Sequence, residues 1–113
     1  MFRQLFSFSK KEIDQIFSHA ELRKKQHGFK LLQVSFDTLP EELQKVLVSG
    51  KLLVITPRSS GKAHDRNLLR RRAKEIFYSE KLYLKPVISI LIVSRFVSKI
   101  SFDTLKEFLL KNI

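Results

Sequence analysis

The stretch GKAHDRNLLRRRAKEIFY, residues 61–78, holds the side chains of this sequence that are best suited to binding an anion. It contains six Lys or Arg residues, and Glu75 is the one acid in its middle. Most of these cations are arginines, whose planar guanidinium can contact two phosphate oxygens at once. This composition favours nucleic acid as the partner over an acidic protein or a membrane surface, and over a helix face that is merely solvated.

The periodicity of this stretch predicts a helix over 63–80 with two distinct faces. At about 100° per residue, one face is apolar and consists of Leu69, Ala73, Ile76 and Phe77. The adjoining sector carries Arg66, Asn67, Arg70, Arg71 and Lys74. We therefore expect the apolar face to pack on a sheet and the cations to form a directed surface.

The whole chain is basic as well. Its 113 residues carry 22 Lys and Arg against 11 Asp and Glu, a net charge of +11, and 43% of them are hydrophobic. This size and composition predict one folded domain, residues 1–113. The absence of cysteine excludes disulfides and thiolate zinc sites. The most apolar run, residues 87–93, is far shorter than the roughly 20 residues that cross a bilayer, so no membrane partner is expected.

The remaining patterns predict a small sheet covered by helices. Ser9 and Glu12 form a capping box at the start of the first helix, and Ser101 caps the last one. The expected elements are a helix from 9 to between 24 and 28, a strand over 29–36, a short helix over 40–48, a strand over 52–57, the basic helix, a strand over 87–93 and a helix from 101. This order predicts an α/β sandwich with a βαβ unit over 52–94. A basic helix in that crossover suits recognition of RNA by shape and phosphate better than entry into a DNA groove.

The basic stretch resembles the signature of the bacterial ribonuclease P protein component. In that signature Gly-Lys-Ala precedes an Arg-Asn-Arg triplet, followed by Lys-Arg, Arg-Glu and a Phe. The matching positions here are Gly61, Lys62, Ala63, Arg66, Asn67, Arg70, Arg71, Lys74, Glu75 and Phe77. Leu68 stands where the second arginine of the triplet belongs. Either the RNA contact is weaker at this position, or the neighbouring Arg72 supplies the cation.

The resemblance extends over most of the chain and is weakest over 29–50. Phe17 keeps one of two aromatic residues of the family's first helix, and Ile13 replaces the other. The strand before the signature reads Thr-Pro-Arg at 56–58, where the family has Ser-Lys-Lys. After the strand over 87–93, Ser94 and Arg95 replace an Arg-Lys pair. The segment 37–50 is longer than the turn that the family pattern suggests.

The resemblance implies a fold and a function. The fold would be a small central sheet with αβββαβα order, a crossover of the uncommon left-handed kind, and a short inserted helix near 40–48. The function would be that of the protein subunit of ribonuclease P, the ribonucleoprotein that removes the 5′ leader from precursor tRNA in the cytoplasm. The RNA subunit would cut the phosphodiester with Mg²⁺. The protein would not be catalytic, in keeping with its dispersed acids and lack of a nucleophilic triad.

The resemblance also assigns residues to two surfaces. The surface for the catalytic RNA would consist of Lys62, Arg66, Asn67, Arg70, Arg71 and Lys74. The surface for the single-stranded leader would include Phe17, Arg58 and Arg95. By its spacing alone, four residues after Ile13, Phe17 is more often a core residue than a platform on which bases stack. The main alternative function is a general basic RNA-binding protein, of ribosomal or chaperone type, without a role in tRNA processing. A protein-only nuclease would need an acidic metal cluster that the sequence does not display.

Overall fold

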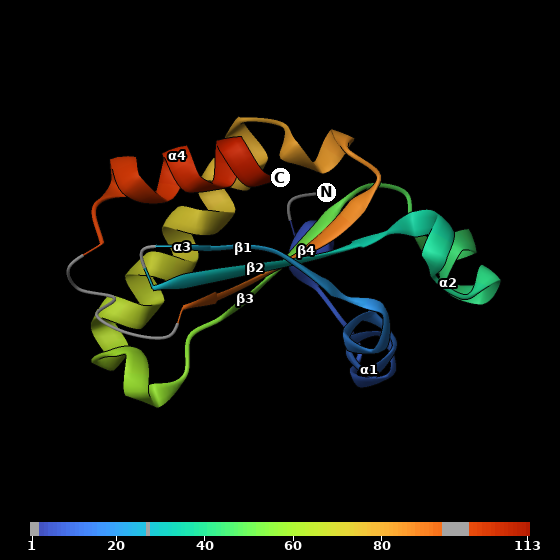
Figure 1. Ribbon diagram of the computed structural model, residues 1–113, viewed down its shortest axis with the longest axis horizontal. Coiled ribbons are helices and arrows are strands. Elements are labelled where there is room, and N and C mark those ends of the chain that lie inside the picture. The colour runs from blue at the N-terminus through green and yellow to red at the C-terminus, as the bar shows by residue number, and fades with distance from the viewer. Residues whose placement is uncertain (1–2, 27, 94–99) are drawn as a thin grey trace.

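The computed structural model describes residues 3–26, 28–93 and 100–113. The helices are α1 (Lys10–His19), α2 (Glu41–Val46), α3 (Ala63–Ser79) and α4 (Phe102–Asn112), and short 3-10 turns precede or connect them. The strands are β1 (Glu21–Gln26), β2 (Phe29–Ser35), β3 (Lys51–Ile55) and β4 (Val87–Val93). The strands form one sheet, with α3 and α4 on one side of it and α1 on the other (Figure 1).

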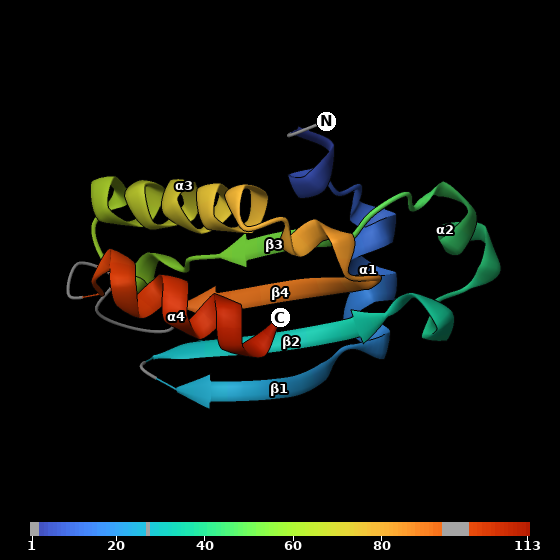
Figure 2. The same cartoon turned by 90° about the horizontal axis from the view of Figure 1, so that it is seen from above.

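The strand order in the sheet is β1-β2-β4-β3. The hairpin of β1 and β2 is antiparallel, and β4 pairs with β2 in the antiparallel sense and with β3 in the parallel sense. Figure 2 shows α3 beside β3, as the connection between the two parallel strands. The expected βαβ unit is therefore confirmed, and so is the αβββαβα order with α2 as the inserted helix.

The first helix is shorter than the sequence predicted. The helix α1 ends at His19, and the residues expected to continue it form β1. All six residues of β1 are exposed, so this strand has no apolar alternation that would distinguish it from the end of a charged helix. It is held by pairing with β2, from Glu21 opposite Gln33 to Gln26 opposite Phe29. Tertiary pairing therefore overrides the local pattern.

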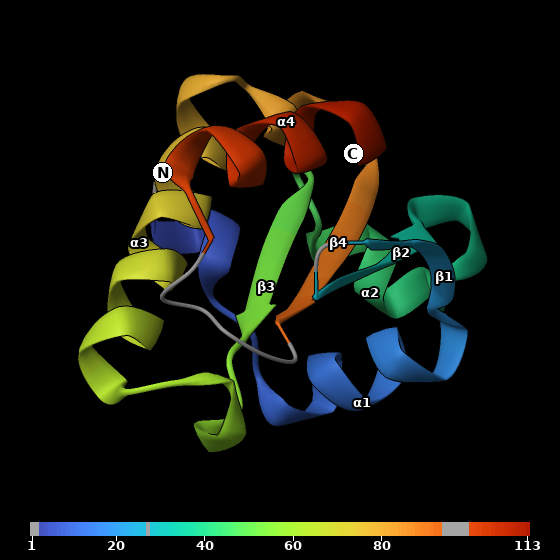
Figure 3. The same cartoon turned by 60° about the vertical axis from the view of Figure 1, so that its left-hand side comes forward.

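The sheet has a hydrophobic cluster on each side. Figure 3 shows the helices that cover these two sides, α3 and α4 on one and α1 and α2 on the other. On one side Phe29, Leu31, Leu91 and Val93 pack under α3 and α4. The apolar face of α3, comprising Leu69, Ala73, Ile76 and Phe77, is buried there as predicted. On the other side Ile16 of α1 and Leu43 of α2 pack on Val34, Ile88 and Ile90. The central strand β4 is thus covered on both faces over most of its length.

The predicted helix starts are also confirmed. Ser9 Oγ accepts a hydrogen bond from the Glu12 amide at 3.1 Å, and the Ser9 amide donates to Glu12 Oε1 at 3.3 Å. The amide of Thr104 donates to Ser101 Oγ at 3.1 Å, which fixes the first turn of α4. These caps satisfy backbone amides that a helix leaves without an internal partner.

Candidate nucleic-acid interface

The six residues predicted to bind RNA lie together on α3 and its N-cap. We call them the basic face: Lys62, Arg66, Asn67, Arg70, Arg71 and Lys74. Arg66, Arg70 and Lys74 follow each other at intervals of one turn and are half-buried, because they border the face that packs on the sheet. Arg71 and Asn67 point further outward and are exposed, as is Lys62 at the N-cap.

Two arginines of the basic face are anchored at the end of β3. Arg70 Nη1 donates a hydrogen bond to Thr56 Oγ1 at 2.6 Å, and Arg70 Nη2 donates to Asn67 Oδ1. Arg66 Nη1 donates to the carbonyl oxygen of Thr56 at 3.3 Å. Arg66 Nε is buried and has no hydrogen-bond partner within the described part of the chain. The two guanidinium groups are therefore held in place at the end of β3.

The third residue along this side of α3 contacts the N-terminal segment. Lys74 Nζ lies 5.6 Å from the centroid of the Phe6 ring, a distance at which a cation and a ring attract each other. Phe6 in turn meets Phe77 of the core edge to face, with ring centroids 5.8 Å apart. The 3-10 turn Arg3–Phe6 thereby supports the end of the basic face.

The side chain of Leu68 lies on the other flank of α3, toward α4. It is half-buried and lines a small hollow together with Leu69, Arg72, Ile100 and Leu105. The guanidinium carbon of Arg72 lies 6.0 Å from the centroid of Phe102, the first residue of α4. Leu68 thus has a packing role between α3 and α4. Arg72, one turn further on, is the cation of this flank.

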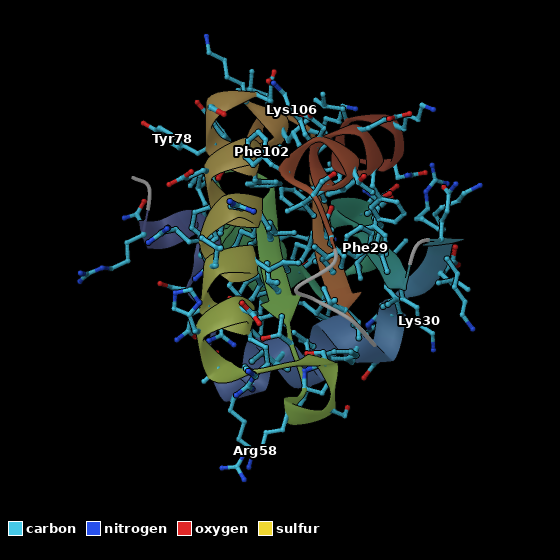
Figure 4. All side chains as sticks on the ribbon, turned by 90° about the vertical axis from the view of Figure 1, so that its left-hand side faces the viewer. Phe29, Lys30, Arg58, Tyr78, Phe102 and Lys106 are labelled. Carbon is cyan, nitrogen blue, oxygen red and sulfur yellow. The ribbon has the colours of Figure 1, made fainter. Side chains whose placement is uncertain are left out.

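The predicted leader surface is described only in part. Phe17 on α1 is 41% exposed, so it is not a core residue, whereas its neighbour Ile16 is buried. Arg58 is exposed, and in Figure 4 its side chain points away from the body of the protein. Arg95 lies outside the described residues. Phe17 and Arg58 come from different ends of the sheet, since α1 contacts the first residue of β3 and Arg58 follows the last.

Between these two residues the sheet has a face that α1 leaves uncovered. One row of cross-strand partners, here called the cross-sheet row, runs from β1 to β3 as Lys25, Lys30, Ile92 and Ile55. Both lysines are exposed and both isoleucines are half-buried, although Ile88 and Ile90 further along β4 are fully buried. Figure 4 looks onto this end of the sheet and shows Lys30 at its border.

The sequence pattern does not predict the cross-sheet row. Lys25 falls where the pattern predicts the end of a helix, whereas it lies on β1. The alternation of FKLLQVS would have placed Lys30 on the same face as Leu32 and Val34. Ile92 and Ile55 gave no signal of their own, because half-buried and fully buried isoleucines look the same in a sequence.

The described residues show neither a metal cluster nor a membrane span. No three His, Cys, Asp or Glu side chains come close enough together in the described ranges to hold a metal ion. Within the same ranges, no helix combines the length and the apolarity that crossing a membrane requires.

The fold and the basic face define a class of protein: an α/β protein with ordered guanidinium groups on one helix, an arrangement that suits a phosphate polymer. The sequence model of the family Ribonuclease P matches residues 3–113. The chain belongs to the ribonuclease P protein family. No curated protein sequence matches it.

Solved structures of ribonuclease P proteins share the fold. The structure of the Staphylococcus aureus protein superposes with a TM-score of 0.74 at 14% sequence identity, covering 96% of this chain and 91% of that chain. The Thermotoga maritima protein superposes with a TM-score of 0.71 at 21% identity, covering 94% of this chain and 92% of that chain. A complex of the Thermotoga maritima protein with 1-(4-fluorophenyl)-2-thiourea gives a TM-score of 0.69 at 23% identity, with 90% and 91% covered.

Membership of this family establishes the kind of activity. The chain is a protein subunit of ribonuclease P, it acts in tRNA processing, and its partner is an RNA with which it forms a ribonucleoprotein. The alternative of a general RNA-binding protein is not favoured.

Proposed function

We propose that the basic face binds the catalytic RNA of ribonuclease P, and that the uncovered face of the sheet takes the 5′ leader of precursor tRNA. The observation that carries the proposal is the anchoring of Arg66 and Arg70 on Thr56, beside the exposed Arg71. Ordered guanidinium groups bind phosphates with less loss of side-chain freedom than mobile ones.

The role of the basic face is electrostatic. Each phosphate that it neutralises releases condensed counterions from the RNA, which favours binding at low salt. The same cations lower the repulsion between the catalytic RNA and an incoming tRNA precursor. Arg72 on the other flank of α3 supplies the charge that Leu68 does not, since both side chains line the same hollow.

The role of the uncovered face follows from its mixture of apolar and cationic side chains. Single-stranded nucleic acid is bound where bases rest on flat apolar or aromatic groups and phosphates meet cations. The cross-sheet row supplies two isoleucines and two lysines for this purpose. Phe17 offers a ring at one end of the face. Arg58 lies at the other end. Arg95 follows β4 in the sequence, lies outside the described residues and stays a predicted member of this surface.

The protein has no catalytic residue in this proposal. The RNA subunit holds the Mg²⁺ that promotes hydrolysis, and no set of acidic side chains in the described residues fits that ion. The chain contributes binding, orientation and charge neutralisation. Since bacterial precursor tRNA is made in the cytoplasm, we infer that the protein acts there.

The experiment that tests the proposal is a leader-cleavage assay at low Mg²⁺ concentration. A bacterial ribonuclease P RNA would process a precursor tRNA without protein, with the natural chain, and with the double variant R66A/R70A. We expect the natural chain to stimulate cleavage and the double variant to lose that stimulation. The matched control is K45A/K111A, which removes two exposed cations from α2 and α4 and should stimulate normally. A natural chain that binds RNA without stimulating cleavage would favour the general RNA-binding alternative instead.

A further inference from the structure

Thr56 is a buried polar residue that no direct role in RNA binding accounts for. It follows β3, its exposed fraction is 7%, and it precedes Pro57, which cannot donate a backbone hydrogen bond. Its two oxygen atoms accept from different arginines: the hydroxyl from Arg70 at 2.6 Å and the carbonyl from Arg66 at 3.3 Å. The arginines are one helical turn apart, so a single residue at the end of β3 holds both.

The hydrogen bonds of Arg70 leave part of its guanidinium free for a ligand. A guanidinium has five N–H groups in a fixed plane. One Nη group contacts Thr56 and the other contacts Asn67, which fixes the plane through both of its ends. The remaining N–H groups can then meet phosphate oxygens without a search through side-chain rotamers. Thr56 itself is too deeply buried to reach the RNA.

We propose that Thr56 is a positioning residue for RNA recognition, which acts by fixing Arg70 through its hydroxyl and Arg66 through its carbonyl. This inference rests on the proposed function of the basic face. A merely structural Thr56 would stabilise the end of β3 and affect RNA binding only through loss of folded protein. The positioning role and the structural role of Thr56 can be separated by experiment. A side-chain substitution removes the hydroxyl that holds Arg70 and leaves the carbonyl contact to Arg66 in place.

The variants for the test are Thr56→Val, which keeps the branched shape but loses the hydroxyl, and Thr56→Ser, which retains it. Binding to the catalytic RNA of bacterial ribonuclease P would be measured over a series of salt concentrations, with thermal unfolding to establish the folded fraction. We expect T56V to weaken binding about 2- to 12-fold, because the Arg70 side chain would then have to be ordered when the RNA binds. T56S should bind like the natural chain. The slope of log K against log salt should not change in T56V. This slope depends on the number of phosphate contacts, which stays the same even though Arg70 is less well ordered before binding.

Double variants separate positioning from general damage. In the R70A background T56V should have no further effect, because the group that Thr56 holds is already gone. In the R66A background T56V should weaken binding by its full factor, because the hydroxyl does not act on Arg66. Full loss in both backgrounds, or natural binding by T56V, would overturn the role of Thr56 and leave the basic face intact. If R70A alone binds like the natural chain, the proposed role of Arg70 fails, and the inference about Thr56 fails with it.

Discussion

Lys25 on β1 and Lys30 on β2 stand directly opposite each other, so two exposed ammonium groups share the face of the sheet that α1 leaves uncovered. Like charges at opposite positions of an antiparallel pair are destabilising. A lysine on an edge strand has an ordinary explanation, since a charged side chain there prevents the edge from pairing with a strand of another molecule. That explanation covers Lys25 but not Lys30, which lies on an inner strand. The pair therefore indicates a surface adapted to an anion.

The first prediction is that Lys25→Glu separates stability from RNA binding. A Glu opposite Lys30 exchanges repulsion for attraction, so the free energy of unfolding should rise by about 0.2–1 kcal/mol at low salt. Binding of a single-stranded leader should weaken at the same time, because the substitution reverses a charge on the proposed leader surface. Urea unfolding and leader binding measured at equal salt would check both changes. Lys45→Glu on α2 is the control for charge alone, and equal weakening by both variants would count against the cross-sheet row.

The second prediction concerns Arg71, an exposed member of the basic face. Arg71→Ala should weaken binding to the catalytic RNA and lower the slope of log K against log salt by about 0.7–0.9, which corresponds to one lost phosphate contact. The measurement is a salt series of equilibrium binding. An unchanged slope would mean that Arg71 faces solvent in the complex. Because the Arg71 side chain is exposed, thermal unfolding of the variant should stay close to that of the natural chain.

The third prediction tests whether Arg72 replaces the arginine missing at Leu68. Arg72→Ala should weaken RNA binding about as much as Arg71→Ala does. Adding Leu68→Arg to Arg72→Ala should restore much of the affinity, because the two side chains lie one turn apart on the same flank of α3. Equilibrium binding of both variants decides the question. If R72A binds normally, the RNA does not use this flank, and Arg72 serves only to cover Phe102.

The fourth prediction concerns the stability of the fold at Gly50. A Cβ added there would lie 2.5 Å from the carbonyl oxygen of Lys85 and 2.9 Å from that of Val87. The backbone before β4 would have to shift, so we expect Gly50→Ala to lower the free energy of unfolding by about 1–3 kcal/mol. Denaturant unfolding measures this change. Val48→Ala, at a side chain that is 88% exposed, should change stability by less than about 0.5 kcal/mol.

The sequence predicted those elements whose patterns are set by burial. The unbroken apolar run over 87–93 predicts a strand covered on both sides, and β4 occupies these residues. The apolar face of α3 followed from its 3.6-residue period. β1 could not be found in the same way, since an edge strand with every residue exposed carries no periodic signal. Its existence depends on β2, its neighbour in the sheet.

The residues of the candidate site also differ in whether the sequence could predict them. The basic face could be predicted because its residues are close in sequence and one helix brings them together. Thr56 could not, since its contact with Arg70 joins residues on different elements. The cross-sheet row is still less visible, because its members come from separate strands and meet only through the sheet register.

The strand order β1-β2-β4-β3 has a consequence for how the chain folds as it is synthesised. The hairpin of β1 and β2 can form early, but β3 acquires its partner only when β4 has left the ribosome. By then α3 has already been made, and it lacks the finished sheet on which its arginines are positioned. We therefore expect the cations of a growing chain to stay disordered until the central strand has been made. The ability to bind RNA in an ordered way would then be acquired late in synthesis, together with completion of the sheet.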